Sequence, residues 1–162
     1  MTGSDAEVRI AEWKVARAPT RFVAYGLGSC VGILLRDADS RVGGMAHVML
    51  PESRLYPGVS EPGKYADTAI ESMLLEMGKL GADRSLLNAK LVGGATMFGP
   101  SSRITGLTIG LRNVMAAREH LTRLGIPVVA EDVGGRKGRT VFFDLQDGSV
   151  KVRSFNQPVT TL

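Results

Sequence analysis

An almost unbroken apolar run at residues 30–36 (CVGILLR) constrains the fold of this chain more than any other sequence feature. A run of this length is typical of a strand that is buried on both faces. Residues 37–40 (DADS) favour a turn, and residues 42–50 (VGGMAHVML) form a second apolar run behind it. The sequence therefore predicts two buried strands that return on each other as a hairpin.

Strand and helix patterns share the rest of the chain. Apolar side chains follow helical spacing at residues 64–80 and 108–124, and a glycine ends each segment. Residues 51–63 are rich in proline and glycine and are expected to form a loop. Further strands are expected at residues 7–17, 21–27, 89–94 and 127–132, and a last hairpin at 139–146 and 149–155 around the turn pair Asp147-Gly148.

This mixture of hairpins and crossovers predicts an α/β (mixed α+β) fold, with a mixed β-sheet or sandwich flanked by helices. The chain has 162 residues, which fits a single domain, and no repeat or composition break divides it. We expect one domain over 1–162, with a core of about 7–155 and a frayed tail at 156–162.

Composition excludes several classes of protein. Cys30 is the single cysteine, so an internal disulfide and every CxxC zinc or redox motif are ruled out. The formal net charge of +4 is mild and the aromatic content is 6%, which does not favour nucleic-acid binding. No apolar run approaches the length of about 18 residues that a membrane span needs, and the first residues lack the pattern of a signal peptide. We expect a soluble cytoplasmic protein that inserts in no membrane.

Cys30 is the first candidate for chemistry. It follows the glycine-rich segment Gly26-Leu27-Gly28-Ser29 and precedes an apolar strand. Free cysteine is often a small buried hydrophobe, and that interpretation stays open. However, glycines before a nucleophile let backbone N–H groups approach a substrate oxygen, as an oxyanion hole requires.

His47 lies in the returning strand, seventeen residues after Cys30. If the two runs pair with a turn near residues 38–40, residues whose numbers add to 77 or 78 face each other, and Cys30 meets His47. An imidazole beside a thiol can withdraw its proton and generate the nucleophilic thiolate. A histidine hydrogen-bonded within the sheet is the alternative interpretation.

Other residue groups predict less chemistry. His120 is expected on the second helix at a polar edge, and Cys30, His47 and His120 lack the fourth ligand of a metal site. The glycines at 26–28 do not complete a dinucleotide fingerprint, because Val31 stands where the third glycine belongs and a strand follows. A basic cluster, Arg136, Lys137 and Arg139, is expected to be a solvated loop or a surface for an acidic partner.

Six motifs together resemble the chemoreceptor glutamine deamidase family, CheD. They occur in the family's order over about residues 10–153, and their number makes the resemblance specific. The motifs are GLGSCV at 26–31, GGMAHVMLP at 43–51, PGKYADTAI at 62–70, GGATMF at 93–98, IGLRN at 109–113 and AEDVGG at 130–135.

The resemblance implies a fold similar to cytotoxic-necrotizing-factor-type deamidase domains and hydrolysis of receptor glutamines to glutamate with release of ammonia. It implies Cys30 as nucleophile and His47 as base, with backbone N–H groups at Gly28 and Ser29 near the oxyanion and with no metal or cofactor. The implied partners are the cytoplasmic helices of chemoreceptors, as substrate, and the CheC phosphatase.

One position departs from the family's pattern. The family carries a catalytic threonine six residues before the cysteine, where this chain has Ala24. His47 must then be held by a backbone carbonyl, by Tyr25 or by a bound water, and Ala24→Thr is expected to raise turnover. Two rival functions stay open: a weakly active or non-catalytic adaptor that binds CheC or receptors, and a thiol redox sensor, which lacks a resolving cysteine.

Overall fold

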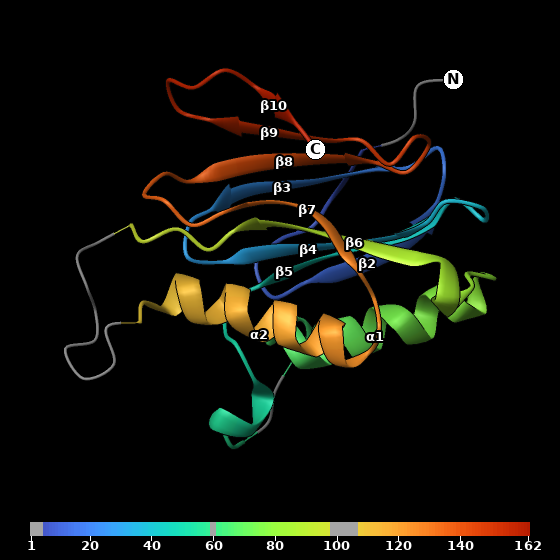
Figure 1. Cartoon of the computed structure of the whole chain (residues 1–162), viewed down its shortest axis with the longest axis horizontal. Coiled ribbons are helices and arrows are strands. Elements are labelled where there is room, and N and C mark those ends of the chain that lie inside the picture. Colours follow the sequence, from blue (N-terminus) through green and yellow to red (C-terminus); the bar gives the residue numbers. More distant parts are fainter. Residues whose placement is uncertain (1–4, 59–60, 98–106) are drawn as a thin grey trace.

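The computed structural model describes residues 5–58, 61–97 and 107–162. The described chain forms two mixed five-stranded sheets packed face to face, and two helices cover the outer face of the second sheet (Figure 1). The predicted mixed α+β class is confirmed, and the helices lie on one side of the sandwich only.

The first sheet has the order β1-β3-β8-β9-β10, in which β1 and β3 are parallel and the other neighbours antiparallel. Its strands are β1 (Asp5–Glu7), β3 (Arg21–Leu27), β8 (Arg139–Asp144), β9 (Val150–Ser154) and β10 (Thr160–Thr161).

The second sheet has the order β2-β5-β4-β6-β7, in which only β6 and β7 are parallel. Its strands are β2 (Trp13–Arg17), β5 (Val42–Val48), β4 (Val31–Asp37), β6 (Leu87–Gly93) and β7 (Val128–Val133). The helices are α1 (Ala66–Lys79) and α2 (Ile109–Arg123), and short 3-10 helices occupy Ser53–Leu55, Pro62–Lys64 and Arg84–Leu86.

Strand β4 is buried on both faces, as its apolar run predicts. Val31, Ile33 and Leu35 pack in the cluster under the helices, whereas Leu34 packs in the cluster between the sheets. Side chains alternate along a strand, so the even-numbered positions of β4 and its extension point between the two sheets. Cys30 packs against that inner cluster.

The prediction of a single strand at residues 7–17 is wrong. The chain pairs with β3 of the first sheet as β1, turns at Ile10 and Ala11, and joins the second sheet beside β5 as β2. Ala11 has a φ of 65°, in the left-handed region. Within residues 7–17, only Glu7 belongs to β1, residues 8–12 form the connection, and residues 13–17 form β2.

The tail expected to be frayed at 156–162 carries a strand at its far end. Thr160 and Thr161 pair with β9, and the backbone of Leu162 exchanges two hydrogen bonds with that of Val150. Lys90 Nζ from β6 also donates to the Leu162 carbonyl oxygen at 2.9 Å. The segment is ordered by partners that are distant in the sequence.

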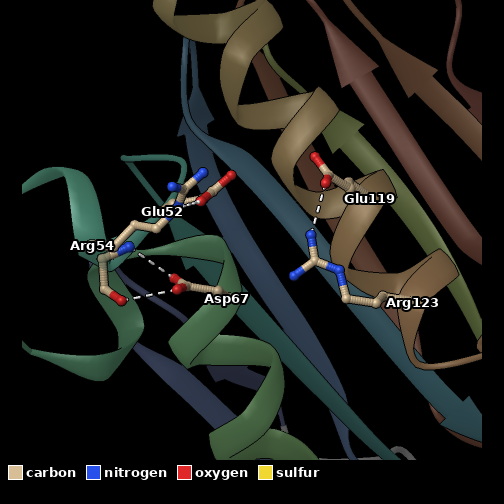
Figure 2. Close-up of polar contacts among 6 residues, drawn as sticks. Glu52, Arg54, Asp67, Glu119 and Arg123 are labelled. Carbon is tan, nitrogen blue, oxygen red and sulfur yellow. Dashed lines mark hydrogen bonds and ion pairs between the residues drawn. The ribbon is translucent and has the colours of Figure 1, made fainter.

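The segment between β5 and α1 is fastened to the start of α1 (Figure 2). The Asp67 carboxylate accepts hydrogen bonds from the backbone N–H and the hydroxyl of Ser53, at 3.1 and 2.8 Å. Glu52 and Arg54 pair with each other on the same segment, while Glu119 and Arg123 pair along α2. The hydrogen bonds between Ser53 and Asp67 hold the chain that follows β5 against the start of α1.

Asp37 fixes the opposite end of the β4–β5 hairpin. Burial alone would raise the pKa of this carboxyl, but hydrogen bonds from Asp83, Ser40 and Asp39 outweigh burial and lower it. Because this pKa is lower in the folded than in the unfolded chain, ionised Asp37 stabilises the fold at neutral pH. That contribution is lost as the pH falls through the folded-state pKa.

We expect Asp37→Asn to lower the free energy of unfolding by about 2 kcal/mol at pH 7, because an amide nitrogen would replace one acceptor oxygen. Denaturant unfolding of both proteins across acidic pH measures the effect. The difference between them should shrink as the pH falls, and a difference that is constant with pH would contradict this role for the carboxylate.

Candidate active site

Cys30 and His47 lie on the same face of the second sheet, between the two sheets. The paired residue numbers of the β4–β5 hairpin add to 79, so His47 faces Gly32, and Cys30, just before β4, lies diagonally from it. The predicted sum of 77 or 78 is too small, because the turn contains four residues, 38–41. Arg41, the last of them, has a φ of 54°. Diagonal neighbours on one face of a sheet remain within reach of long side chains.

The two side chains differ in access. Cys30 is half-buried, whereas His47 is 1% exposed. A substrate would therefore meet the thiol first, with the imidazole behind it.

A backbone carbonyl orients His47. Its Nδ1 lies 3.2 Å from the carbonyl oxygen of Val8. Because a carbonyl oxygen can only accept, Nδ1 carries the proton in this contact, and Nε2 of the neutral ring holds a lone pair. Nε2 is buried and has no hydrogen-bond partner among the described residues. The tautomer is therefore the one that a general base acting through Nε2 requires.

The turn between β1 and β2 also holds the main chain of His47. The Ala11 N–H donates to the His47 carbonyl oxygen and the His47 N–H donates to the Glu12 carbonyl oxygen, both at 2.9 Å. Gly63 packs against this turn so closely that a Cβ there would lie 2.2 Å from the Ala11 oxygen. The connection between β1 and β2 therefore binds both the N–H and the carbonyl group of His47. A single continuous strand over residues 7–17 would not make these two contacts.

Burial sets the protonation of both groups. It raises the pKa of the Cys30 thiol, against a smaller opposite effect of its own backbone N–H. Burial also lowers the pKa of His47, against the smaller effects of the Val8 hydrogen bond and the Glu12 charge. Both shifts favour a neutral thiol and a neutral imidazole at rest, so a thiolate at Cys30 would form only if the thiol lost its proton.

We expect alkylation of Cys30 by iodoacetamide to be slower at pH 7 than that of an exposed cysteine, because the thiolate is the reactive form. Its rate should keep rising above the pH at which an ordinary thiol is fully ionised. Intact mass against time measures the rate, and the single cysteine makes the signal specific. A rate that levels off near neutral pH would show an ion pair in place of the neutral pair.

The glycine-rich segment before Cys30 is held by the segment that follows β6. Ala95 N–H donates to the Gly28 carbonyl oxygen and Gly94 N–H to the Cys30 carbonyl oxygen, both at 2.8 Å. No acceptor for the backbone N–H groups of Gly28 and Ser29 occurs among the described residues. These carbonyl contacts fix the segment, and within the described chain its Gly28 and Ser29 N–H groups are left without an acceptor.

The six motifs meet at this end of the sandwich. Besides the contacts of Gly94 and Ala95 described above, the Gly134 N–H donates to the Gly93 carbonyl oxygen. The N–H groups of Met49 and Leu50 both donate to the Lys64 carbonyl oxygen. From α2, Asn113 Nδ2 donates to the carbonyl oxygens of Ser29 and Met49. Phe98, the last residue of the fourth motif, lies outside the described residues. The motifs, far apart in sequence, therefore surround one location.

The three basic residues line a cavity of about 360 Å³ but are not equivalent. Arg139 is bound by its Nε to Asp132 Oδ1 at 3.1 Å, and its side chain is 9% exposed. Arg136 and Lys137 are exposed. Two of the three charges can therefore meet a partner, and the third stabilises the fold.

The remaining candidates are not part of the site. His120 Nε2 lies 3.0 Å from Glu71 Oε1 and links α2 to α1. Within residues 5–58, 61–97 and 107–162, no cluster of three His, Cys, Asp or Glu side chains is placed to hold a metal ion. Tyr25 is exposed, whereas His47 is buried with its Nδ1 beside the Val8 carbonyl oxygen, and Ala24 is fully buried in the inner cluster with Val8.

Sequence reasoning missed two groups at this site. The Val8 carbonyl is a backbone group, which no sequence pattern marks. Asn113 carried a signal, because it is a polar residue on the buried, otherwise apolar face of α2.

A half-buried thiol and a buried imidazole lie on one face between the two sheets, and no described residue accepts from the backbone N–H groups of Gly28 and Ser29 beside the thiol. Cysteine hydrolases use groups of these kinds. The family model "CheD chemotactic sensory transduction" matches residues 49–154 of the chain. The chain is 43% identical to the "Probable chemoreceptor glutamine deamidase CheD" of Desulforamulus reducens, covering 98% of this chain and 96% of that protein.

Two further relatives carry the same name. Identity is 46% to the protein of Moorella thermoacetica, over 98% of this chain and 95% of the relative, and 41% to that of Clostridium novyi, over 100% of both. The chain belongs to the CheD family. Among its described residues, no helix is both long and apolar enough to cross a membrane.

Proposed function

We propose that this chain is a cytoplasmic enzyme that deamidates glutamine side chains of chemoreceptors through Cys30. Relatives over nearly the whole chain are named chemoreceptor glutamine deamidases. The observation that carries the mechanism is the His47 tautomer: Nδ1 lies beside the Val8 carbonyl oxygen, and Nε2, on the face that carries Cys30, has no hydrogen-bond partner within the described part of the chain. The similarity to cytotoxic-necrotizing-factor-type deamidase domains stays a prediction from the resemblance.

The reaction uses two proton transfers through His47. Nε2 takes the proton of the Cys30 thiol while the sulfur attacks the glutamine Cδ. The backbone N–H groups of Gly28 and Ser29 stabilise the oxyanion. The intermediate then collapses, and Nε2 gives its proton to the departing nitrogen, which leaves as ammonia.

A thioester between Cys30 and the substrate remains. A water molecule gives a proton to Nε2 and attacks the thioester carbon, and the sulfur leaves and recovers that proton. The products are glutamate and the free thiol, and the steps require no metal or cofactor.

Surface charge favours an acidic helical partner. Arg136 and Lys137 are exposed beside the segment that contacts Gly93, so they lie at the same end of the molecule as Cys30. We propose that they guide the cytoplasmic helices of the receptor toward the site. The CheC phosphatase is the second proposed partner, on the strength of the family resemblance.

The proposed function is tested with a purified receptor cytoplasmic fragment and the full chain. We expect one ammonia for each glutamine converted to glutamate. Binding of the fragment without ammonia release would support the adaptor function instead.

The Val8 carbonyl changes the expectation for Ala24→Thr. Since Nδ1 already has an acceptor, a threonine hydroxyl has little left to orient, and we expect turnover within about threefold of the wild type. Steady-state rates on the same fragment measure this. A gain of ten- to a hundredfold would mean that His47 is poorly held in this chain and that the missing threonine limits it.

A further inference from the structure

Asn113 connects the chain segments that carry Cys30 and His47. It lies in the first half of α2, is fully buried, and its Nδ2 donates to the carbonyl oxygens of Ser29 at 3.0 Å and Met49 at 3.1 Å. Both partners can only accept, so the amide nitrogen must face them and the orientation of the amide is determined.

The two carbonyls lie where the β4–β5 ladder stops. The last ladder pair at this end is Val31 with Val48, and the register places Cys30 and Met49 just beyond it. Ser29 precedes Cys30, and Met49 follows His47 by two residues. One amide group therefore bridges the two strand ends at the point where ladder hydrogen bonds no longer hold them together.

The other atom of this amide indicates a role beyond stability. Asn113 Oδ1 is buried and has no hydrogen-bond partner among the described residues. A buried acceptor without a partner destabilises the fold. The residue otherwise lies on an apolar helix face, beside Val114, Ala117 and Leu121.

We infer that Asn113 is a positioning residue, which fixes Cys30 relative to His47 by holding the ends of β4 and β5 together. It donates only to the backbone and has no part in the proton transfers. This inference rests on the proposed function for its effect on turnover, but its effect on the Cys30 thiol can be measured without any substrate.

The test uses Asn113→Asp, which keeps the shape but loses both N–H donors, and Asn113→Ser, which keeps one shorter donor. Leu121→Ala is the matched control, because Leu121 is buried on the same helix and its apolar side chain donates no hydrogen bond to either strand end. Thermal unfolding establishes the temperature at which each protein is folded. Turnover and iodoacetamide alkylation are then measured below that temperature.

We expect kcat on the receptor fragment to fall about 10- to 100-fold in the Asn113 variants, with KM within about twofold. Alkylation of Cys30 at pH 7.5 should rise by about threefold or more, because a released segment exposes the thiol and lowers its pKa. Leu121→Ala should change neither quantity, although it unfolds at a lower temperature.

The inference is overturned if a folded Asn113 variant keeps both the wild-type kcat and the wild-type alkylation rate, or if Leu121→Ala reproduces both changes. If the wild-type protein releases no ammonia, the proposed function fails, and the alkylation rates alone still decide the role of Asn113.

Discussion

Cys30→Ala is expected to abolish deamidation, with a loss of roughly four orders of magnitude or more, because no other thiol exists in the chain to form the thioester. Cys30→Ser should be as inactive, since a hydroxyl with the same partner is a far weaker nucleophile. Ammonia release from the receptor fragment measures both variants.

The fold should survive these changes. Cys30 lies at the edge of the inner cluster and is half-buried, so alanine removes little packed volume. Thermal unfolding close to that of the wild type is the control that separates lost chemistry from lost structure. Ammonia release by a folded Cys30→Ala protein would exclude the cysteine mechanism.

His47→Gln is expected to lower kcat by about three orders of magnitude or more, because base and nucleophile act as a unit. Glutamine can still donate toward the Val8 carbonyl, but it cannot take a proton from the thiol. The loss should therefore persist at every pH at which the protein is folded.

His120→Gln is the matched control for this second prediction. It removes the only other histidine, which pairs with Glu71 between the two helices and lies outside the site. We expect its turnover to equal that of the wild type. Equal losses in both variants would mean that histidine removal acts through stability, and would contradict the base role of His47.

Local periodicity was enough to predict the elements around the site. The apolar runs at 30–36 and 42–50 correspond to β4 and β5, and the helical spacing at 64–80 and 108–124 corresponds to α1 and α2, with shifted ends. These patterns can be read from short stretches of sequence, because the apolar residues of each helix or strand recur at the spacing that places them on its buried side.

Long-range partners explain where prediction failed. The crossing between the sheets at Ala11 packs closely against Gly63, which is distant in sequence. Similarly, β10 forms because β9 and Lys90 offer it partners. The predicted register of the β4–β5 hairpin was one or two residues too low, because the turn-favouring residues after β4 do not reveal whether three or four of them form the turn.

The sequence was enough to predict that Cys30 and His47 lie close together, while their catalytic roles stay predictions. Cys30 and His47 stood out by their residue types and glycine-rich neighbours, and the register places both on one face. The groups that hold them did not stand out, because the Val8 carbonyl belongs to the main chain and Asn113 comes from another layer of the fold.

The most direct test of the account is the mass of a receptor fragment after incubation with the enzyme in ¹⁸O-labelled water. Hydrolysis through a thioester takes the new oxygen from water, so each converted glutamine should gain about three daltons, against about one in ordinary water. We predict this gain with the wild-type protein and none with Cys30→Ala. No gain with the wild type, or the same gain with Cys30→Ala, would contradict the central claim that Cys30 hydrolyses receptor glutamines.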